Sequence, residues 1–369
     1  MADTHDSAGG SAQPARAGAV DPGGSLTDVA GISVGHYERI GRGWRTGTTA
    51  IIARDGATAG VDVRGGGPGT RETDLLRPEN LIQQVHGICL TGGSAFGLAA
   101  AEGMMSWLES KGIGFPIGQL PGTVVPIVPG AVIFDLGRGG VIANRPTPDF
   151  GSRAARAARR TPEANGAVGA GAGAIAGGLQ GGVGSASTRL PSGIVVAALA
   201  VVNAAGSVID RSTGLPWERA AHRLRRPSRP ERELLLAVTA PPTPPTNSDS
   251  LNTSSLNTTI GVVATTARLS KAECTKVASV THDGMARAIR PVHSMFDGDT
   301  VFALATGIDE LPDESTTGFR TEGTRPAVLN TILEAAAVCF AAACTQAVVS
   351  ATSIGGPLAY RDLCPSAFR

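Results

Sequence analysis

One junction in the chain constrains its fold more than any other feature. Residues 226–257 are rich in Pro, Ser, Thr and Asn, whereas residues 258–265, with the sequence TTIGVVAT, form an apolar run rich in β-branched side chains. The first composition is typical of a flexible segment longer than an ordinary loop, and the second is typical of a buried β-strand. We therefore expect the chain to pass abruptly at Asn257-Thr258 from an exposed linker into the interior of a sheet.

The remaining sequence predicts an α+β fold in a single domain over residues 25–369. Apolar runs of strand length alternate with longer patterns of helical period. The expected strands are 31–36, 48–53, 60–63, 85–90, 124–128 and 131–134, with a strand-rich block at 193–210, and the expected helices are 94–111, 270–289 and 326–351. Hydrophobic residues make up 42% of the chain, which is enough for a substantial core. Residues 1–24 contain almost no large apolar side chain and are expected to form a disordered tail.

Charge and cysteine content exclude several classes of protein. Lys and Arg total 32 against 31 Asp and Glu, a balance that does not predict nucleic-acid binding. The five cysteines are odd in number and widely spaced, so neither a disulfide framework nor a zinc site is expected. Residues 1–10 are polar and acidic, unlike a secretory signal, which favours a cytoplasmic location. The Ala-rich stretch 335–351 contains polar interruptions and is interpreted as a buried helix, so no membrane association is expected.

The chain lacks the sequence patterns that bind common cofactors. The glycine-rich segment 169–173 resembles a dinucleotide-binding loop, but no acidic residue follows about 20 positions later and no clear βαβ unit surrounds it. A Walker A sequence is absent, and the six histidines have no metal-ligand spacing. We therefore expect neither a cofactor nor a metal, and histidine-based catalysis is not indicated.

The layout at Asn257-Thr258 predicts self-cleavage by an N-terminal nucleophile. The Thr258 hydroxyl can attack the preceding carbonyl and move the acyl group from nitrogen to oxygen, after which water hydrolyses the ester. The freed α-amine, with an ordinary pKa of about 7.7–8.0, can then act as the base for its own hydroxyl. A Pro-rich loop that simply leads into a strand is the alternative. A second pair, Asn252-Thr253, lies five residues upstream, and we favour the later pair because it directly precedes the strand.

Two acidic residues add to this prediction. Asp297 and Asp299 lie two positions apart, immediately before another strand pattern at 300–304. On an extended segment both carboxylates would lie on one face, where they could orient the amine and hydroxyl or share a proton. Alone, Asp-Gly-Asp is more often a turn or part of a calcium loop, although further calcium ligands are lacking here.

Several segments together resemble the P1 family of peptidases, which comprises the L-aminopeptidase/D-esterases, the β-peptidyl aminopeptidases and the nylon-oligomer endohydrolase. The resemblance extends from about residue 26 to residue 357. The segments that carry it are GH (35–36), RTGTT (45–49), RETDLL (71–76), LTGGSAFGL (90–98), VPGAVIFD (128–135), GGVGSAS (181–187), NTTI (257–260) and DGDT (297–300). It implies an αββα sandwich of the N-terminal-nucleophile type, no cofactor, and self-cleavage into chains 1–257 and 258–369. These chains would stay associated in a homo-oligomer, often a tetramer.

The resemblance also implies roles for individual residues. Asn257 corresponds to the last residue of the larger chain and Thr258 to the nucleophile. Asp297 and Asp299 match the nylon-oligomer hydrolase pattern, whereas the β-peptidyl aminopeptidases have Ser and Glu there. Asn203 is similar to the Asn that helps to bind the oxyanion.

Two positions depart from the family pattern. Gln180 stands where the family usually has an active-site lysine, and Phe134 stands where some members have tyrosine. Because Gln180 carries no charge, we expect slower processing or an altered pH dependence. The residues expected to line the substrate cleft are Phe134, Gly92, Gly93 and Ser94.

The resemblance therefore implies a self-processing amidohydrolase or aminopeptidase that acts on short peptides or amino-acid oligomers, with nylon-type 6-aminohexanoate oligomers among the candidates. Two alternatives stay open. One is acyl transfer of the ornithine acetyltransferase type, which shares the threonine self-cleavage logic. The other is a non-catalytic oligomeric member of the family, for which the uncharged Gln180 is the main argument.

Overall fold

The computed structural model describes residues 19–118, 122–219, 222–240, 257–312 and 324–369. Nine strands form one continuous hydrogen-bonded sheet, and β1 (Ile32–Gly41) joins it by pairing with β2. The other strands, in spatial order, are β10 (Gly182–Arg189), β11 (Val195–Asn203), β14 (Thr258–Ala267), β15 (Thr300–Asp309), β2 (Trp44–Val63), β4 (Gln84–Thr91), β7 (Gly130–Val132) and β3 (Thr70–Arg71).

The long strand β2 lets this sheet fold into two layers. Its first half pairs with β1, with Ile32 opposite Ala53, and its second half pairs with β15, with Thr300 opposite Val63. Its pairing with β4 is broken by an irregularity between Ile52 and Ala57, and such irregularities bend and twist a strand. Apolar side chains from β2 and β4 then pack against side chains from β11 and β14 in one buried cluster.

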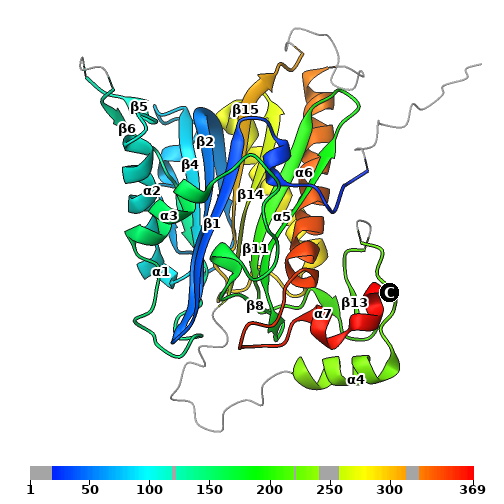
Figure 1. The fold of residues 1–369 in the computed structure, drawn as a ribbon. Coiled ribbons are helices and arrows are strands. Elements are labelled where there is room, and N and C mark those ends of the chain that lie inside the picture. Colours follow the sequence, from blue (N-terminus) through cyan, green and yellow to red (C-terminus); the bar gives the residue numbers. More distant parts are fainter. Residues whose placement is uncertain (1–18, 119–121, 220–221, 241–256, 313–323) are drawn as a thin grey trace, which may run out of the picture.

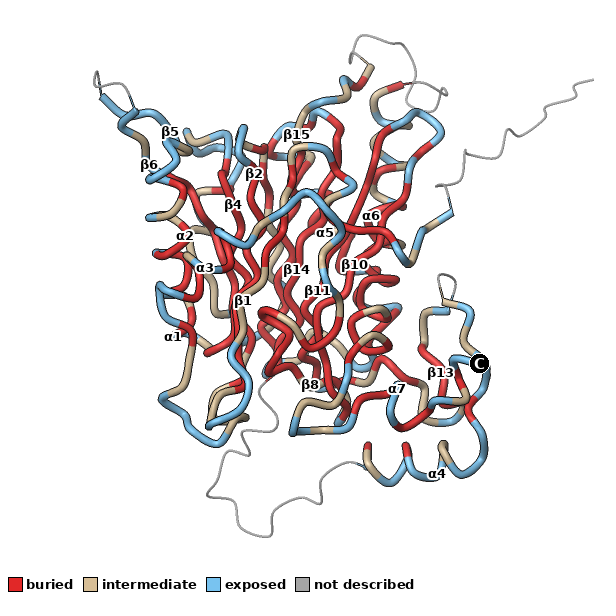
Figure 2. The backbone as a smooth tube through the Cα atoms, in the orientation of Figure 1, coloured by how far each residue is buried: buried red, intermediate tan, exposed pale blue. Residues whose placement is uncertain are grey.

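Helices cover the outer face of each layer, which gives the predicted αββα arrangement (Figure 1). On the β1, β2 and β4 side lie α2 (Ala100–Glu109) and α3 (Pro148–Ala157). On the side of β10, β11, β14 and β15 lie α5 (Lys271–Ala288) and α6 (Arg325–Val349). The buried backbone is concentrated in the strands between these helices (Figure 2).

The helix α6 is apolar around its whole circumference, as expected for a helix inside a core. It is long and apolar enough to cross a membrane, but 78% of its most apolar window is buried inside the protein. Gly184 on β10 faces it closely, and an added Cβ there would meet the carbonyl of Ala343 and the backbone of Ala347. Small residues on both elements therefore permit this close packing.

The remaining short helices and strands lie outside the nine-stranded sheet. They are α1 (Ser94–Gly97), α4 (Arg229–Val238), α7 (Tyr360–Leu363), β5 (Phe115–Pro116), β6 (Val124–Val125), β8 (Ile175–Ala176), β9 (Leu179–Gln180), β12 (Ile209–Asp210) and β13 (Leu215–Pro216). The single helix expected over 94–111 is therefore two helices, and the strands expected at 48–53 and 60–63 are one strand.

Two segments expected to be flexible contain ordered structure. In the predicted tail 1–24, Asp21 exchanges backbone hydrogen bonds with Ser187. In the predicted linker 226–257, α4 forms because Ser228 and Glu231 make a capping box and Leu235 is buried. The Pro, Ser, Thr and Asn content of the whole segment 226–257 outweighed the local capping signal of this helix. Residues 1–18 and 241–256 lie outside the described part of the chain.

Candidate active site

Thr258 is the first residue of the central strand β14, as the junction predicts. It lies directly opposite Asn203, the last residue of the neighbouring strand β11. Both residues are buried, Asn203 completely and Thr258 to within 5% of its surface. Pairing on both sides of β14 holds this strand end in a defined position.

The carbonyl group of Asn257 lies in a defined hydrogen-bonding environment. Its oxygen accepts a hydrogen bond from the backbone N–H of Gly298 (3.2 Å) and one from the Thr258 hydroxyl (2.5 Å). A Cβ on Gly298 would lie 2.9 Å from the Thr258 Oγ1, so a glycine is needed for this approach. The Gly298 N–H is a fixed donor that can stabilise an oxyanion developing on this oxygen, and the Thr258 hydroxyl lies beside the same carbonyl group.

The two acidic residues contact different parts of the site. Asp299 accepts a hydrogen bond from the Thr259 N–H at Oδ1 (2.7 Å), and its Oδ2 lies 2.8 Å from Nδ1 of His293. Asp297 accepts a hydrogen bond from the Ser294 N–H (2.8 Å). Within the described residues, no hydrogen bond joins either carboxylate to the Thr258 hydroxyl. Asp299 therefore orients the backbone next to Thr258, while Asp297 shapes the turn that carries Gly298.

Burial raises the pKa of the Asp297 carboxyl, and its neighbour Asp299 adds to this effect. The hydrogen bonds from Ser294 act in the opposite direction. A raised pKa brings this carboxyl closer to the range in which it could hold a proton during a reaction.

A pair of histidines that no sequence motif indicated, His293 and His282, lies next to Asp299. His293 has a left-handed backbone conformation (φ 59°), and its ring lies edge-on to that of His282, with centroids 4.9 Å apart. His282 is fully buried, and its Nε2 lies 3.1 Å from the carbonyl oxygen of Asp62. Spacing alone gave no signal, because His293 reaches Asp299 through this unusual turn.

The buried His282 predicts a loss of stability in acid. Burial lowers the pKa of His282 from 6.5 to about 4, so the unfolded chain takes up this proton first as the pH falls. The contribution of His282 to the free energy of unfolding is therefore fully present above pH 6.5. It is lost progressively as the pH falls from 6.5 towards 4, by about 2 kcal/mol at pH 5. Urea unfolding at pH 7.5 and pH 5 measures this loss. The loss should be smaller in His282→Gln, and an equal loss in that variant would contradict the assignment.

Asn203 is held by Arg138, a half-buried arginine. Its Oδ1 accepts hydrogen bonds from the Arg138 guanidinium and from the N–H of Ile175 (3.1 Å), and its Nδ2 points to the carbonyl oxygen of Phe134 at 3.4 Å. The amide N–H predicted to bind an oxyanion is thus oriented towards Phe134, while the donor on the Asn257 carbonyl is Gly298.

Gln180 is completely buried, and its amide is fully hydrogen-bonded. Its Oε1 accepts from the Arg45 guanidinium (2.7 Å), and its Nε2 donates to the carbonyls of Ala174 and Gly181 (both 3.0 Å). A positive charge therefore does lie at this position, but it belongs to Arg45. Arg45 belongs to the segment RTGTT (45–49), which carries the family resemblance, but no role was predicted for it.

This contact predicts the effect of restoring a lysine. Gln180→Lys should lower the free energy of unfolding by about 2 kcal/mol or more, because it places a second buried positive charge beside Arg45. Urea unfolding measures the change. The double variant Arg45→Gln, Gln180→Lys should recover most of the lost stability. Equal stability of the native protein and Gln180→Lys would show that the two side chains do not interact as described.

Asp135 lies near Arg45 and Arg138. Burial raises the pKa of Asp135 to about 6, against the opposing effects of its hydrogen bonds and of both arginines. Its Oδ1 accepts the N–H of Gly93 (2.6 Å), and a Cβ on Gly92 would collide with its carboxyl group. The two glycines expected in the substrate cleft therefore pack around this buried acid.

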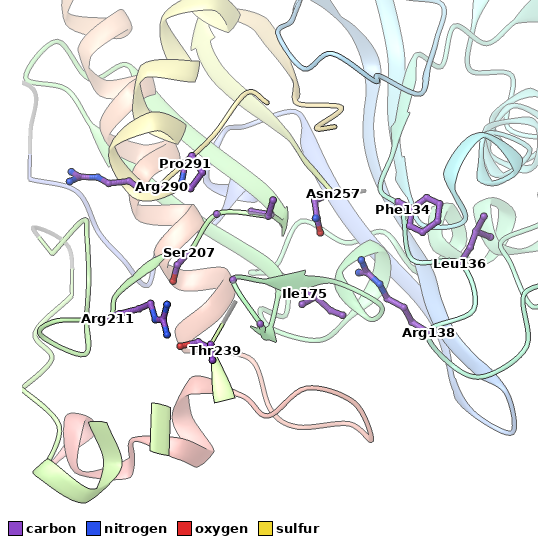
Figure 3. A pocket seen from close by; sticks show the side chains of 16 residues that line it. Phe134, Leu136, Arg138, Ile175, Ser207, Arg211, Thr239, Asn257, Arg290 and Pro291 are labelled. Carbon is purple, nitrogen blue, oxygen red and sulfur yellow. The ribbon is translucent and has the colours of Figure 1, made fainter. Parts of the chain in front are cut away.

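A pocket of about 610 Å³ opens beside Asn257, the residue that precedes β14 (Figure 3). Phe134 and Asn257 line it, together with Arg138, whereas Gly92, Gly93 and Ser94 are not among its lining residues. Among the described residues, no group of three or more His, Cys, Asp or Glu side chains could hold a metal ion.

The family model described as Peptidase family S58 matches residues 24–360, nearly the whole chain. The chain belongs to peptidase family S58. The predicted family resemblance is thus confirmed, and the S58 chain is a hydrolase of peptide or amide bonds. It is 48% identical over 356 residues to an uncharacterized aminopeptidase of Mycobacterium bovis, covering 93% of this chain and 99% of that protein. It is 32% identical over 299 residues to a 6-aminohexanoate-oligomer endohydrolase of Kocuria sp., covering 77% and 76%.

Solved structures show the same fold for this S58 peptidase. A β-aminopeptidase of Burkholderia sp. superposes with a TM-score of 0.67 at 24% identity, covering 95% of this chain and 94% of the other. An L-aminopeptidase D-Ala-esterase/amidase of Ochrobactrum anthropi, described as a variant of the Ntn hydrolase fold, gives a TM-score of 0.65 at 20% identity, covering 92% and 89%. The predicted α+β fold of the N-terminal-nucleophile type is confirmed.

Proposed function

We propose that this S58 peptidase cleaves its own chain between Asn257 and Thr258 and then uses Thr258 as an N-terminal nucleophile. The observation that carries the proposal is the Asn257 carbonyl, whose oxygen accepts hydrogen bonds from both the Gly298 N–H and the Thr258 hydroxyl. The bond lies at the buried start of a central strand, where the reacting groups have little freedom.

Self-cleavage takes place in two steps. The Thr258 Oγ1 releases its hydrogen bond to the carbonyl oxygen and attacks the Asn257 carbonyl carbon, and the hydroxyl proton passes to the leaving backbone nitrogen. The C–N bond breaks, which leaves an ester between Asn257 and the Thr258 side chain. Water then hydrolyses this ester to a carboxylate at Asn257 and a free hydroxyl and α-amine at Thr258. The Gly298 N–H stabilises the oxyanion that forms on the carbonyl oxygen.

The same groups support turnover of a substrate amide. The freed α-amine of Thr258 takes the proton of the Thr258 hydroxyl, and the hydroxyl oxygen attacks the substrate carbonyl carbon. The α-amine then passes this proton to the substrate nitrogen, which leaves as an amine. Water then cleaves the acyl-enzyme. Asp299 keeps the nucleophile in place through the N–H of Thr259. Asn203, oriented by Arg138, offers its Nδ2 to the oxyanion in exchange for its contact with the Phe134 carbonyl oxygen.

Short peptides and amino-acid oligomers are the proposed substrates. The named relatives support two groups, the N-terminal peptide bonds that aminopeptidases cleave and the amide bonds of 6-aminohexanoate oligomers. We also propose that the processed enzyme is a cytoplasmic homo-oligomer, with a tetramer as the expected form.

A denaturing gel with intact-mass measurement and N-terminal sequencing tests this function. Cleavage of the 37.2 kDa chain at this bond gives fragments of about 26 and about 11 kDa, in proportion to the lengths of 1–257 and 258–369. The smaller fragment should begin with Thr258. A chain that stays intact for days, or a fragment that begins elsewhere, would overturn the proposal.

A further inference from the structure

The turn that carries the Gly298 donor lies between two other parts of the chain. On one side is the junction, where the Gly298 N–H donates to the Asn257 carbonyl oxygen (3.2 Å) and Asn257 forms a parallel β-bridge with Asp297. On the other side is the segment 64–67, with the sequence RGGG, which directly follows β2. The position of the donor therefore depends on both neighbours, and no role was predicted for the second one.

The segment 64–67, which we call the glycine clasp, holds the turn through its backbone. Its four successive N–H groups donate to carbonyl oxygens of the turn. The bonds join Arg64 and Gly65 to Asp299 (3.0 and 3.2 Å), Gly66 to Ser294 (3.2 Å) and Gly67 to Asp297 (2.8 Å). They continue the pairing of β2 with β15 beyond Val63 and Thr300, which lie opposite each other where β2 ends and β15 begins. The turn is thus fixed as an extension of the central sheet.

Two of the three glycines lie so close to the turn that a side chain would displace it. A Cβ on Gly65 would collide with the carbonyl oxygen of Asp297 and the backbone nitrogen of Asp299. A Cβ on Gly66 would lie 2.6 Å from the nearest backbone atom of the turn, whereas for a Cβ on Gly67 the nearest such atom is 3.8 Å away. None of the three has a left-handed backbone conformation, so the effect of an alanine would come from its contact with the turn.

We infer that the glycine clasp positions the Gly298 N–H for catalysis, and that Gly65 is the positioning residue on which this depends most. The inference rests on the proposed function, because Gly298 is the oxyanion donor of that mechanism. A displaced turn would carry the donor away from the reacting carbonyl oxygen, and catalysis falls steeply with such a displacement. The clasp belongs to residues 1–257 and the donor to residues 258–369, so the smaller chain would depend on the larger one for the geometry of its active site.

Alanine substitution along the clasp tests this inference. Full-length chains are made by cell-free synthesis, and samples stopped at intervals are analysed on denaturing gels for the two fragments. Gly65→Ala should slow self-cleavage at least about tenfold, and Gly66→Ala should slow it less, because its Cβ has more room. Gly67→Ala is the matched control, since its Cβ clears the turn, and it should be cleaved within about twofold of the native rate.

Two further measurements separate positioning from a loss of stability. In processed Gly65→Ala, kcat for an amino-acid anilide should fall about tenfold while KM stays within about twofold, because the donor acts on the oxyanion and not on the bound substrate. Gly103→Ala is the control for stability, since a Cβ on Gly103 of α2 would collide with the Pro148 carbonyl oxygen of α3, in the helical layer over β1, β2 and β4. It should unfold at lower urea concentrations but be cleaved at the native rate.

Cleavage of a folded Gly65→Ala at the native rate, or equal slowing in Gly67→Ala or Gly103→Ala, would overturn the role of the clasp. If Gly65→Ala does not fold, cleavage of Gly66→Ala at the native rate would overturn it instead. Failure of the proposed function has a different signature. In that case the native chain itself stays intact, and the inference falls with it, whereas a clasp without this role leaves native cleavage unaffected and the variants equally fast.

Discussion

Thr258→Ala is expected to remain a single 37.2 kDa chain and to lose amide hydrolysis by at least about a thousandfold. The substitution removes the only atom of Thr258 that can attack the Asn257 carbonyl, Oγ1, and it also prevents release of the α-amine that would act as base. The fold should persist, because the β14 backbone pairing with β11 and β15 does not involve this hydroxyl. Gel analysis over several days and a discontinuous amide-hydrolysis assay measure the two effects.

Thr258→Ser is the matched control for this prediction. It keeps a hydroxyl at the same position and should still be cleaved, although more slowly, because the smaller side chain is less restricted in rotation. Cleavage of Thr258→Ala at the same bond would show that an external protease or another group acts on the chain. It would exclude Thr258 as the nucleophile of self-cleavage.

Asp299→Asn is expected to slow both self-cleavage and hydrolysis by about a hundredfold, because a small displacement of the nucleophile is enough for a loss of this size. The carboxylate accepts hydrogen bonds from the N–H groups of Thr259 (2.7 Å) and His293 (3.1 Å), and an amide in the wrong orientation would present its own N–H groups to them. Rates of fragment formation and steady-state kcat measure the effect. We expect kcat to fall more than KM rises, since Asp299 acts through the backbone beside Thr258.

Asp309→Asn provides a control for simple loss of stability. Asp309 ends the same strand β15, away from the junction, and accepts a hydrogen bond from the Thr266 hydroxyl (2.5 Å). Both variants should unfold at lower urea concentrations, but Asp309→Asn should be processed at the native rate. If the two variants slowed processing equally, Asp299 would have a structural role only.

The sequence predicted the elements around the junction well because their signals are local. An apolar β-branched run after a polar segment places β14 and its first residue correctly, and the capping box of Ser270 and Glu273 marks the start of α5. The family resemblance then supplied Asn203 and Gln180 as candidates. Both residues are buried: Asn203 lies opposite Thr258, and Gln180 is hydrogen-bonded to Arg45.

The parts that sequence reasoning missed depend on long-range packing. Arg45 reaches Gln180 across 135 residues, and Arg138 reaches Asn203 across 65, so no spacing rule connects them. The Gly298 N–H is a backbone group whose importance comes from the turn around it, and its residue type indicated only a bend. The lack of charge at Gln180 was recognised from the sequence, but the positive charge of Arg45 beside it was not predicted.

The order of the strands has a consequence for the two chains that cleavage would create. β14 and β15, both from residues 258–369, lie between β11 and β2, both from residues 1–257. Cutting one peptide bond would change the connectivity but leave every ladder of this interleaved sheet intact. The products would share one cooperative unfolding transition, and because unfolding separates the two chains, its midpoint would rise with protein concentration, unlike that of the uncleaved chain. The smaller chain, expressed alone, would expose an unpaired edge on each side of its two strands, so its correct assembly requires synthesis as part of the precursor.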